Sequence, residues 1–312
     1  MSLIFKSHGK LLITGEYFIL KGAKALCVPT NYYQSLKVNE IDENILKWKS
    51  FDNNKNLWLQ AEFLLSDLTL LTKPTNEVLF LQKLLLNIKK FNSKLFNLNI
   101  GYDIESSMNF NKEWGLGSSS TLISNLSKWA KIDPFDLLWS VSNGSGYDIA
   151  SSIVNKPILY QLNNKKPEYS KIKFYPSFHE NLFFIYRNNK QKTNIEIDYF
   201  NKHVLFDNNV LDKISSLTKK IIDCKNLLDF QKLIINHEKI LSTSLNKKTI
   251  KEELFIDYPG EIKSLGAWGG DFILAAGPSD SNKYFEKKGF KTVIRFCLLY
   301  TSDAADETGR GG

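Results

Sequence analysis

Apolar and polar residues alternate along the first third of the chain, and this pattern predicts short strands separated by polar turns. The clearest strands are expected at 10–14, 25–29 and 33–38. The asparagine-rich segment 52–56 lies between two more apolar runs and predicts a hairpin. Residues 76–91 carry apolar side chains at helical spacing, with basic residues near the end, where they suit the helix dipole.

The pattern changes after Pro157. Strands near 158–162 and 182–186 precede three helical stretches, near 209–223, 226–245 and 248–265. Strands and helices are thus segregated instead of alternating regularly, which favours an α+β fold over a doubly wound sheet. A domain boundary is expected near residues 155–165.

Composition places the chain among ordinary folded proteins, with 43% hydrophobic and 24% charged residues in 312. The 41 basic and 33 acidic residues give a net charge of +8. The basic residues are almost all lysines and are scattered beside acidic ones, whereas nucleic-acid binders usually cluster them on one face. We therefore expect a solvated lysine-rich surface and no nucleic-acid partner. A mild positive field also suits an anionic substrate.

Three further features predict a cytoplasmic protein. No stretch approaches the ~20 apolar residues that a membrane helix needs, so we expect no membrane partner. The N-terminal residues lack the pattern of a signal peptide. Cys27, Cys224 and Cys297 are far apart and lack the spacing of metal ligands, which fits a reducing compartment.

Residues 297–312, CLLYTSDAADETGRGG, resemble a translated sequencing adapter. We treat them as a non-native tail, exclude them from the prediction of the fold, and expect the natural C-terminus to be missing.

The most informative segment is GLGSSS at 115–120, directly before a predicted helix. Glycines allow a tight turn and a close approach of the backbone to a ligand. Free amides at a helix start, together with the helix dipole, favour a phosphate group. A serine hydroxyl can also contribute to Mg²⁺ coordination. The alternative is an ordinary capped helix after a glycine turn. The segment differs from the GxxxxGK[ST] P-loop because no lysine follows the second glycine.

Three other segments carry candidate chemistry. SGYD at 145–148 places Asp148 at the beginning of a helical stretch, where it either stabilises the helix or orients a substrate hydroxyl. GKLLITGEY at 9–17 places Lys10 in a strand, which is unusual unless the strand is an edge. GAWGGD at 266–271 is a glycine run before an apolar strand, so it is either a tight turn or a backbone wall against a ligand.

The order and spacing of these four segments resemble those of the GHMP small-molecule kinases, and the resemblance spans residues 5–276. Residues 9–17 are similar to the first family motif, 115–120 to the ATP phosphate loop, 145–148 to the segment with the catalytic aspartate, and 266–271 to the third motif. The segment GSGYDIA at 144–150 is similar to the corresponding segment of a bacterial GYDIA-type subgroup, which is close to the mevalonate and phosphomevalonate kinases.

The resemblance implies a two-domain α+β fold. Residues 1–157 would form an ATP-binding domain similar to the second domain of ribosomal protein S5. Residues 158–296 would form a ferredoxin-like domain, and ATP and the acceptor would meet between the two.

The resemblance also implies roles for individual residues and the cofactors ATP and Mg²⁺. Asp148 would orient or deprotonate the acceptor hydroxyl, and Lys10 would pair with Asp148. Ser119 would touch Mg²⁺. The β- and γ-phosphates would be held by the backbone of the loop residues Gly115, Leu116, Gly117, Ser118, Ser119 and Ser120. The acceptor would be a small molecule, and the enzyme would be a monomer or a homodimer.

The chain departs from the family pattern at several positions. Trp268 replaces a usual glycine of the third motif. Some relatives use a carboxylate on the preceding helix as a second Mg²⁺ ligand, and here that register falls on Leu137, next to Asp136, which leaves the second ligand open. An enzyme of the mevalonate pathway is the leading hypothesis. A diphosphomevalonate decarboxylase-like enzyme, a non-catalytic ATP-binding regulator and a basic RNA-binding module remain alternatives.

Overall fold

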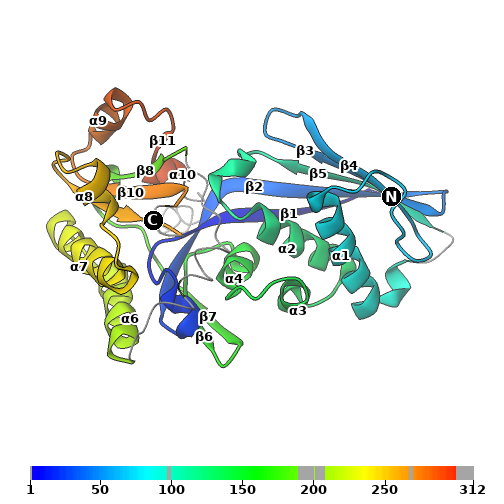
Figure 1. The fold of residues 1–312 in the computed structure, drawn as a ribbon, viewed down its shortest axis with the longest axis horizontal. Helices are drawn as coiled ribbons and strands as arrows, with labels where there is room; N and C mark the ends of the chain where they lie inside the picture. The colour runs from blue at the N-terminus through cyan, green and yellow to red at the C-terminus, as the bar shows by residue number, and fades with distance from the viewer. Residues whose placement is uncertain (1, 97–99, 189–199, 201–207, 267–269, 300–312) are drawn as a thin grey trace, which may run out of the picture. The chain divides into compact units, whose positions relative to one another are not determined.

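The computed structural model describes residues 2–96, 100–188, 200, 208–266 and 270–299 (Figure 1). The chain divides into two compact units. The first comprises Met1–Gly9, Tyr32–Lys112 and Leu116–Ile153, and the second comprises Lys10–Asn31, Glu113–Gly115 and Val154–Gly312. Segments from the first third of the sequence therefore belong to the second unit. The division into domains at residues 157 and 158 stays a prediction.

The first unit contains a sheet with the strand order β4-β3-β5-β2. The bounds of these strands are β2 Ala25–Ile41, β3 Ile45–Phe51, β4 Leu57–Leu64 and β5 Gly101–Met108. Strands β3 and β5 are parallel and the other pairs are antiparallel. The predicted hairpin is confirmed between β3 and β4, where the Asp52 carboxylate accepts backbone N–H bonds from Asn54 and Asn56. Strand β1, Ser2–Leu12, pairs with β2.

The first unit also carries the helices α1 (Asn76–Phe91), α2 (Ser118–Ala130), α3 (Pro134–Trp139) and α4 (Tyr147–Val154). A short 3-10 turn is present at Ser93–Leu95, and a second one, Lys112–Trp114, spans the boundary between the two units in the sequence. Helix α1 begins where the Thr75 side chain accepts a bond from the backbone of Val78. It contacts α2 and β4 (Figure 1). Its buried side chains are Val78, Leu81, Leu84, Leu85 and Ile88.

A buried chain of polar side chains fixes α2 to the sheet. Thr121 donates its hydroxyl to Gln34 Oε1 at 2.6 Å, and Gln34 Nε2 donates to Ser106 Oγ at 2.7 Å. Asn125 donates to the Gln34 carbonyl at 2.9 Å and accepts from Ser7 Oγ at 2.7 Å. Because each of these amides has a partner of fixed direction, the first two turns of α2 are held in one orientation.

The second unit has two groups of strands. The beginning of β2 pairs with β6 (Ile158–Asn163), which pairs with β7 (Lys166–Lys171). A separate antiparallel sheet has the order β11-β8-β10-β9, with the bounds β8 Leu182–Tyr186, β9 Glu261–Ser264, β10 Phe272–Ala276 and β11 Val293–Arg295. Strands β8 and β10 are buried along their whole length, as expected for the central strands of a covered sheet.

The helices of the second unit are α6 (Asn208–Asp223), α7 (Leu227–Leu245), α8 (Ile250–Leu254), α9 (Ser281–Lys287) and α10 (Phe296–Leu299). Two 3-10 turns, Phe18–Lys21 and His179–Asn181, complete the unit. Helix α7 contacts α6, β9 and β10 (Figure 1). Within the described ranges, no helix combines the length and the apolar character needed to cross a bilayer.

Two sequence predictions for this unit need correction. The predicted helix 248–265 is wrong beyond Leu254, because residues 261–264 form β9. Pro259 cannot donate a helical hydrogen bond, and a Cβ on Gly260 would collide with the Ala276 carbonyl, so the chain turns here. Helix α9 was not predicted. In the tail, residues 297–299 belong to α10, and 300–312 lie outside the described residues.

We expect Asn125→Leu to lower the free energy of unfolding by about 1–3 kcal/mol, because it removes the partner of buried polar groups on two strands. Urea denaturation followed by circular dichroism measures this loss. Asn87→Leu is the matched control, since its bond to the Lys83 carbonyl on α1 is exposed. Equal stability of the two variants would contradict a structural role for the buried hydrogen bonds of Asn125.

Candidate functional site

The glycine turn before α2 has the geometry of an exposed helix start. Gly117 lies in the left-handed region, with φ 88° and ψ 44°, and α2 begins at the next residue. The N-cap residue is Gly117 itself, so it supplies no capping side chain. The Gly117 carbonyl accepts bonds from Thr121 N at 2.9 Å and Ser120 Oγ at 2.8 Å. Ser120 is buried and Ser119 is exposed. The first-turn amides are therefore not used by a side chain of the N-cap residue.

The structure brings the predicted first, second and third motifs together at Gly115. Lys10 Nζ donates to the Gly115 carbonyl at 3.3 Å, across 105 residues of sequence. The α-carbon of Gly115 packs against the Asp271 carboxylate so closely that a Cβ would collide with it. Of the third motif, Gly266, Gly270 and Asp271 are described, while Ala267, Trp268 and Gly269 lie outside the described residues.

Aromatic packing holds the segment before this turn. The Trp114 ring contacts Phe272 edge-on, with centroids 5.9 Å apart, and lies 6.3 Å from the Tyr186 ring. Tyr186 donates its hydroxyl to the Glu113 carbonyl at 3.1 Å. Burial raises the pKa of Tyr186, so the hydroxyl keeps this proton. Residues 113–115 are thus fixed to the ends of β8 and β10.

The remaining predicted site residues lie in the first unit. Leu116 is fully buried, and Ser118 and Asp148 are half-buried. Asp148 lies in the first turn of α4 and accepts a bond from Ile149 N at 3.1 Å. Gly146, with φ 83°, allows the preceding turn. Lys10 belongs to the other unit, and its predicted pairing with Asp148 stays a prediction. Asp136 is exposed and Leu137 is buried in α3.

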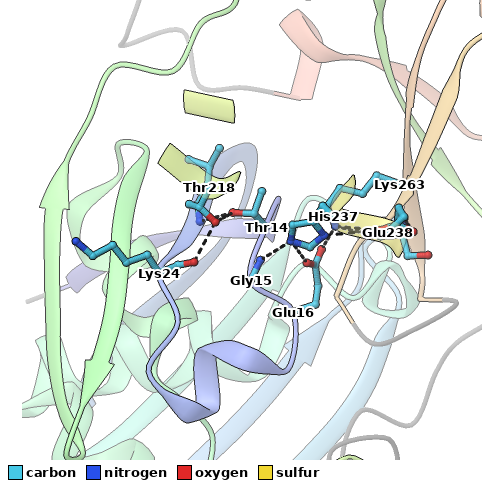
Figure 2. A network of polar contacts seen from close by, with 10 residues as sticks. Thr14, Gly15, Glu16, Lys24, Thr218, His237, Glu238 and Lys263 are labelled. Carbon is cyan, nitrogen blue, oxygen red and sulfur yellow. Dashed lines mark hydrogen bonds and ion pairs between the residues drawn. The ribbon is translucent and has the colours of Figure 1, made fainter. Parts of the chain in front are cut away.

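Sequence reasoning did not predict a buried charged cluster in the second unit. Figure 2 shows it: Lys263 on β9 donates to Glu16 Oε1 at 2.5 Å and lies 3.4 Å from Glu238 Oε1 on α7. His237 Nε2 accepts a bond from Gly15 N at 3.2 Å. All four side chains are almost completely inaccessible to solvent. The only signal in the sequence is the adjacent pair His237-Glu238 in a predicted helix, because Lys263 lies between Ile262 and Ser264 in a short segment with no marked apolar pattern.

The protonation of this cluster follows from its burial. Two carboxylates compete for one ammonium group, and burial raises the pKa of Glu16 to about 7. The attraction of Lys263 and the repulsion of Glu238 are smaller effects that oppose each other. Burial and the Lys263 charge lower the pKa of His237, so the ring is neutral.

Comparisons of sequence identify no relative. Neither a family model nor a curated protein sequence matches the chain significantly.

Comparisons of structure identify the fold. Phosphomevalonate kinase of Streptococcus pneumoniae, solved with phosphomevalonate and AMPPNP, matches with a TM-score of 0.69 and 16% identity, over 94% of this chain and 99% of that one. Mevalonate kinase of Methanococcus jannaschii matches with a TM-score of 0.68 and 17% identity, over 94% and 97% of the two chains. The chain has the GHMP kinase fold.

The GHMP kinase fold is not limited to one acceptor. Galactokinase of Lactococcus lactis, solved with galactose, matches this chain with a TM-score of 0.62 and 14% identity, over 92% and 88% of the two chains. The fold is therefore that of phosphotransferases acting on different small molecules, and the resemblance found in the sequence motifs is confirmed at the level of fold. At these identities, the choice of acceptor does not follow from the fold.

Gly115→Ala tests the contact with Asp271. Gly115 has φ 63°, and its Cβ would collide with the carboxylate, so we expect a loss of about 1–3 kcal/mol in the free energy of unfolding. Gly289→Ala is the control, because Gly289 has φ 90° and open space around it and carries only the backbone strain. Urea denaturation compares the two variants. Equal losses in the free energy of unfolding would show that the Asp271 side chain moves aside without destabilising the protein.

Glu16→Gln tests the buried carboxyl through the dependence of stability on pH. The pKa of Glu16 is raised from 4.5 to about 7 on folding, so the folded protein binds a proton that the unfolded chain has lost. The stabilisation from this group is complete below pH 4.5 and is lost as pH rises through 7. Between pH 5 and pH 8, the stability of Glu16→Gln relative to the wild type should therefore rise by about 2 kcal/mol.

Urea titrations at the two pH values measure this difference. A stability difference that does not change with pH would show that Glu16 keeps an ordinary pKa in the folded protein.

Proposed function

We propose that the chain is an ATP-dependent kinase that transfers the γ-phosphoryl group to a small alcohol or phosphate acceptor. The observation that supports this most directly is the uncapped start of α2 after a glycine turn, with the Lys10 ammonium group bonded to the same turn. A helix start attracts anions through its free amides and its dipole. A lysine fixed beside it adds the positive charge that phosphoryl transfer requires.

The residues of the turn fit a triphosphate and Mg²⁺. The backbone N–H groups of Ser118, Ser119 and Ser120 lie in the first turn of α2, where they have no acceptor in the preceding turn of the helix. The exposed hydroxyl of Ser119 suits a hard cation, which takes oxygen ligands and keeps several waters. In this proposal the segment Gly115 to Ser120 holds the β- and γ-phosphates and Ser119 contributes to the Mg²⁺ site.

Asp148 and Lys10 act on the acceptor and on the developing charge. Bound Mg²⁺-ATP supplies the γ-phosphoryl group and the charge of the metal. Asp148 orients the acceptor hydroxyl and takes up its proton. Lys10 stabilises negative charge at the transferring group. The Lys10 contact with the Gly115 carbonyl fixes the ammonium group beside the phosphate loop.

The acceptor that we favour is mevalonate or phosphomevalonate. The sequence GSGYDIA at 144–150 and the structural matches to mevalonate and phosphomevalonate kinases both support these acceptors. The net charge of +8 suits an anionic acceptor. We propose that the enzyme acts in the cytoplasm, as its sparse cysteines suggest, as a monomer or homodimer and without nucleic acid.

A panel of acceptors tests this function. Release of ADP is measured with mevalonate, phosphomevalonate, diphosphomevalonate, galactose and homoserine, and mass spectrometry identifies each product. A gain of one phosphoryl group on an isoprenoid acceptor is the expected result. Loss of CO₂ from diphosphomevalonate would instead favour a decarboxylase, and no turnover of any acceptor would contradict the proposal.

Asp148→Asn tests the proposed catalytic carboxylate. We expect kcat to fall by about 100-fold to 10,000-fold, since a positioned general base typically contributes this much. Affinity for ATP, measured by calorimetry, should stay near that of the wild type. Asp42→Asn is the matched control, because Asp42 is an exposed carboxylate of the same unit. Full activity of Asp148→Asn would exclude this role for Asp148.

A further inference from the structure

The buried cluster of Figure 2 is attached to the turn that follows the Lys10 strand. This turn consists of Thr14, Gly15 and Glu16, which come directly after β1 and Ile13. The Glu16 carboxylate is bonded to Lys263 of β9. Lys263 also donates to the Ser264 carbonyl at 2.9 Å, and this bond and Glu238 satisfy the rest of its ammonium group. The turn is therefore tied to a strand that lies 247 residues further along the chain.

His237 holds the turn at its backbone. Its Nε2 accepts the Gly15 N–H bond, so the neutral ring carries its proton on Nδ1, which lies 3.9 Å from Glu238 Oε1. Glu238 Oε2 in turn accepts from Ser264 N at 3.1 Å. Glu238 thus joins helix α7 to strand β9, and the bond from Gly15 N orients the His237 ring.

Thr14 is held in the same way by a different helix. Its hydroxyl oxygen accepts from Leu26 N at 3.0 Å and lies 2.8 Å from the hydroxyl of Thr218 on α6. Ile13 N donates to the Leu26 carbonyl at 2.8 Å, which continues the pairing with β2. Each residue of the turn therefore has a buried polar partner that is distant in sequence.

Stability alone does not account for such a cluster. It places two carboxylates and one ammonium group away from water, which leaves one uncompensated negative charge when both acids are ionised. Buried ion pairs are often no more stabilising than apolar residues of the same volume. The cluster instead orients the turn, because each hydrogen bond fixes the position of one of its atoms.

The register of β1 depends on where this turn is anchored. Lys10 lies four residues before Thr14 on a strand that pairs with β2. Side chains of a strand alternate between faces, so a slip by one residue moves every side chain to the opposite face. We propose that Lys263, Glu16 and His237 are positioning residues for Lys10: they anchor the turn at 14–16 and thereby fix the β1 register that presents Lys10 to the Gly115 carbonyl.

This inference rests on the proposed kinase function for its consequence in catalysis, but its structural part can be tested without any activity. The first readout is the rate at which Lys10 is acetylated by trace acetic anhydride, measured by mass spectrometry. Lys232 is the internal reference, because 73% of its side chain is exposed. In the wild type, Lys10 is half-buried and bonded to Gly115, so it should react more slowly than Lys232.

The variants separate anchoring from general loss of packing. Lys263→Met removes the ammonium group, and His237→Ala removes the acceptor of Gly15 N while leaving the ion pair intact. Both should make Lys10 react several-fold faster. Glu16→Gln keeps the shape and an oxygen acceptor for Lys263, so it should preserve the slow wild-type rate. Tyr258→Phe is the control, since it removes a buried bond to Ser281 in the same unit that involves no residue of the turn.

Steady-state kinetics provide the second readout. A displaced Lys10 should lower kcat by about 100-fold in Lys263→Met, since small misplacements of catalytic groups have effects of this size. KM for ATP should change far less, because α2 and its amides are not part of the cluster. Tyr258→Phe should keep the kcat of the wild type.

The outcomes are distinguishable. Unchanged Lys10 labelling in folded Lys263→Met or His237→Ala would overturn the inference, as would equal acceleration in Tyr258→Phe. If Lys263→Met does not fold, His237→Ala decides. A wild-type protein without any kinase activity would refute the proposed function, and the labelling rates would still decide whether the cluster positions Lys10.

Discussion

The contact between the Lys10 ammonium group and the Gly115 carbonyl is the constraint on which the site depends. It joins the end of β1 to the glycine turn that precedes α2. The Asp271 carboxylate packs on the same glycine from the third motif. Three segments that are far apart in the sequence thus meet at one residue without a side chain. Only glycine allows both the left-handed backbone and this close approach.

Two sets of buried polar side chains support this arrangement. In the first unit, Gln34 and Asn125 hold the beginning of α2 against the strands. In the second unit, Lys263 and His237 hold the turn that follows the Lys10 strand. Their value lies in direction more than in stability, because a buried hydrogen bond contributes only about 1 kcal/mol net but fixes the positions of its partners.

The sequence was informative wherever chemistry is local. Spacing and residue type predicted the glycine turn and the helix after it. They also predicted that Lys10 lies in a strand and Asp148 at the start of a helix. The order of the elements predicted the α+β class. The prediction failed where a local pattern is interrupted: apolar spacing continued past Leu254, although α8 ends there and the chain turns at Pro259 and Gly260 before β9. The buried cluster could not be predicted, because nothing local relates Glu16 to Lys263, 247 residues away.

In the proposed function, Lys10 and Asp148 converge on the terminal phosphate of a nucleotide bound at the glycine turn. A crystal structure with Mg²⁺, a non-hydrolysable ATP analogue and phosphomevalonate tests it most directly. We expect the Lys10 ammonium group and the Asp148 carboxylate to lie within about 4 Å of each other, beside the γ-phosphate and the acceptor. A nucleotide bound elsewhere, or the two side chains on separate faces of the protein, would contradict it.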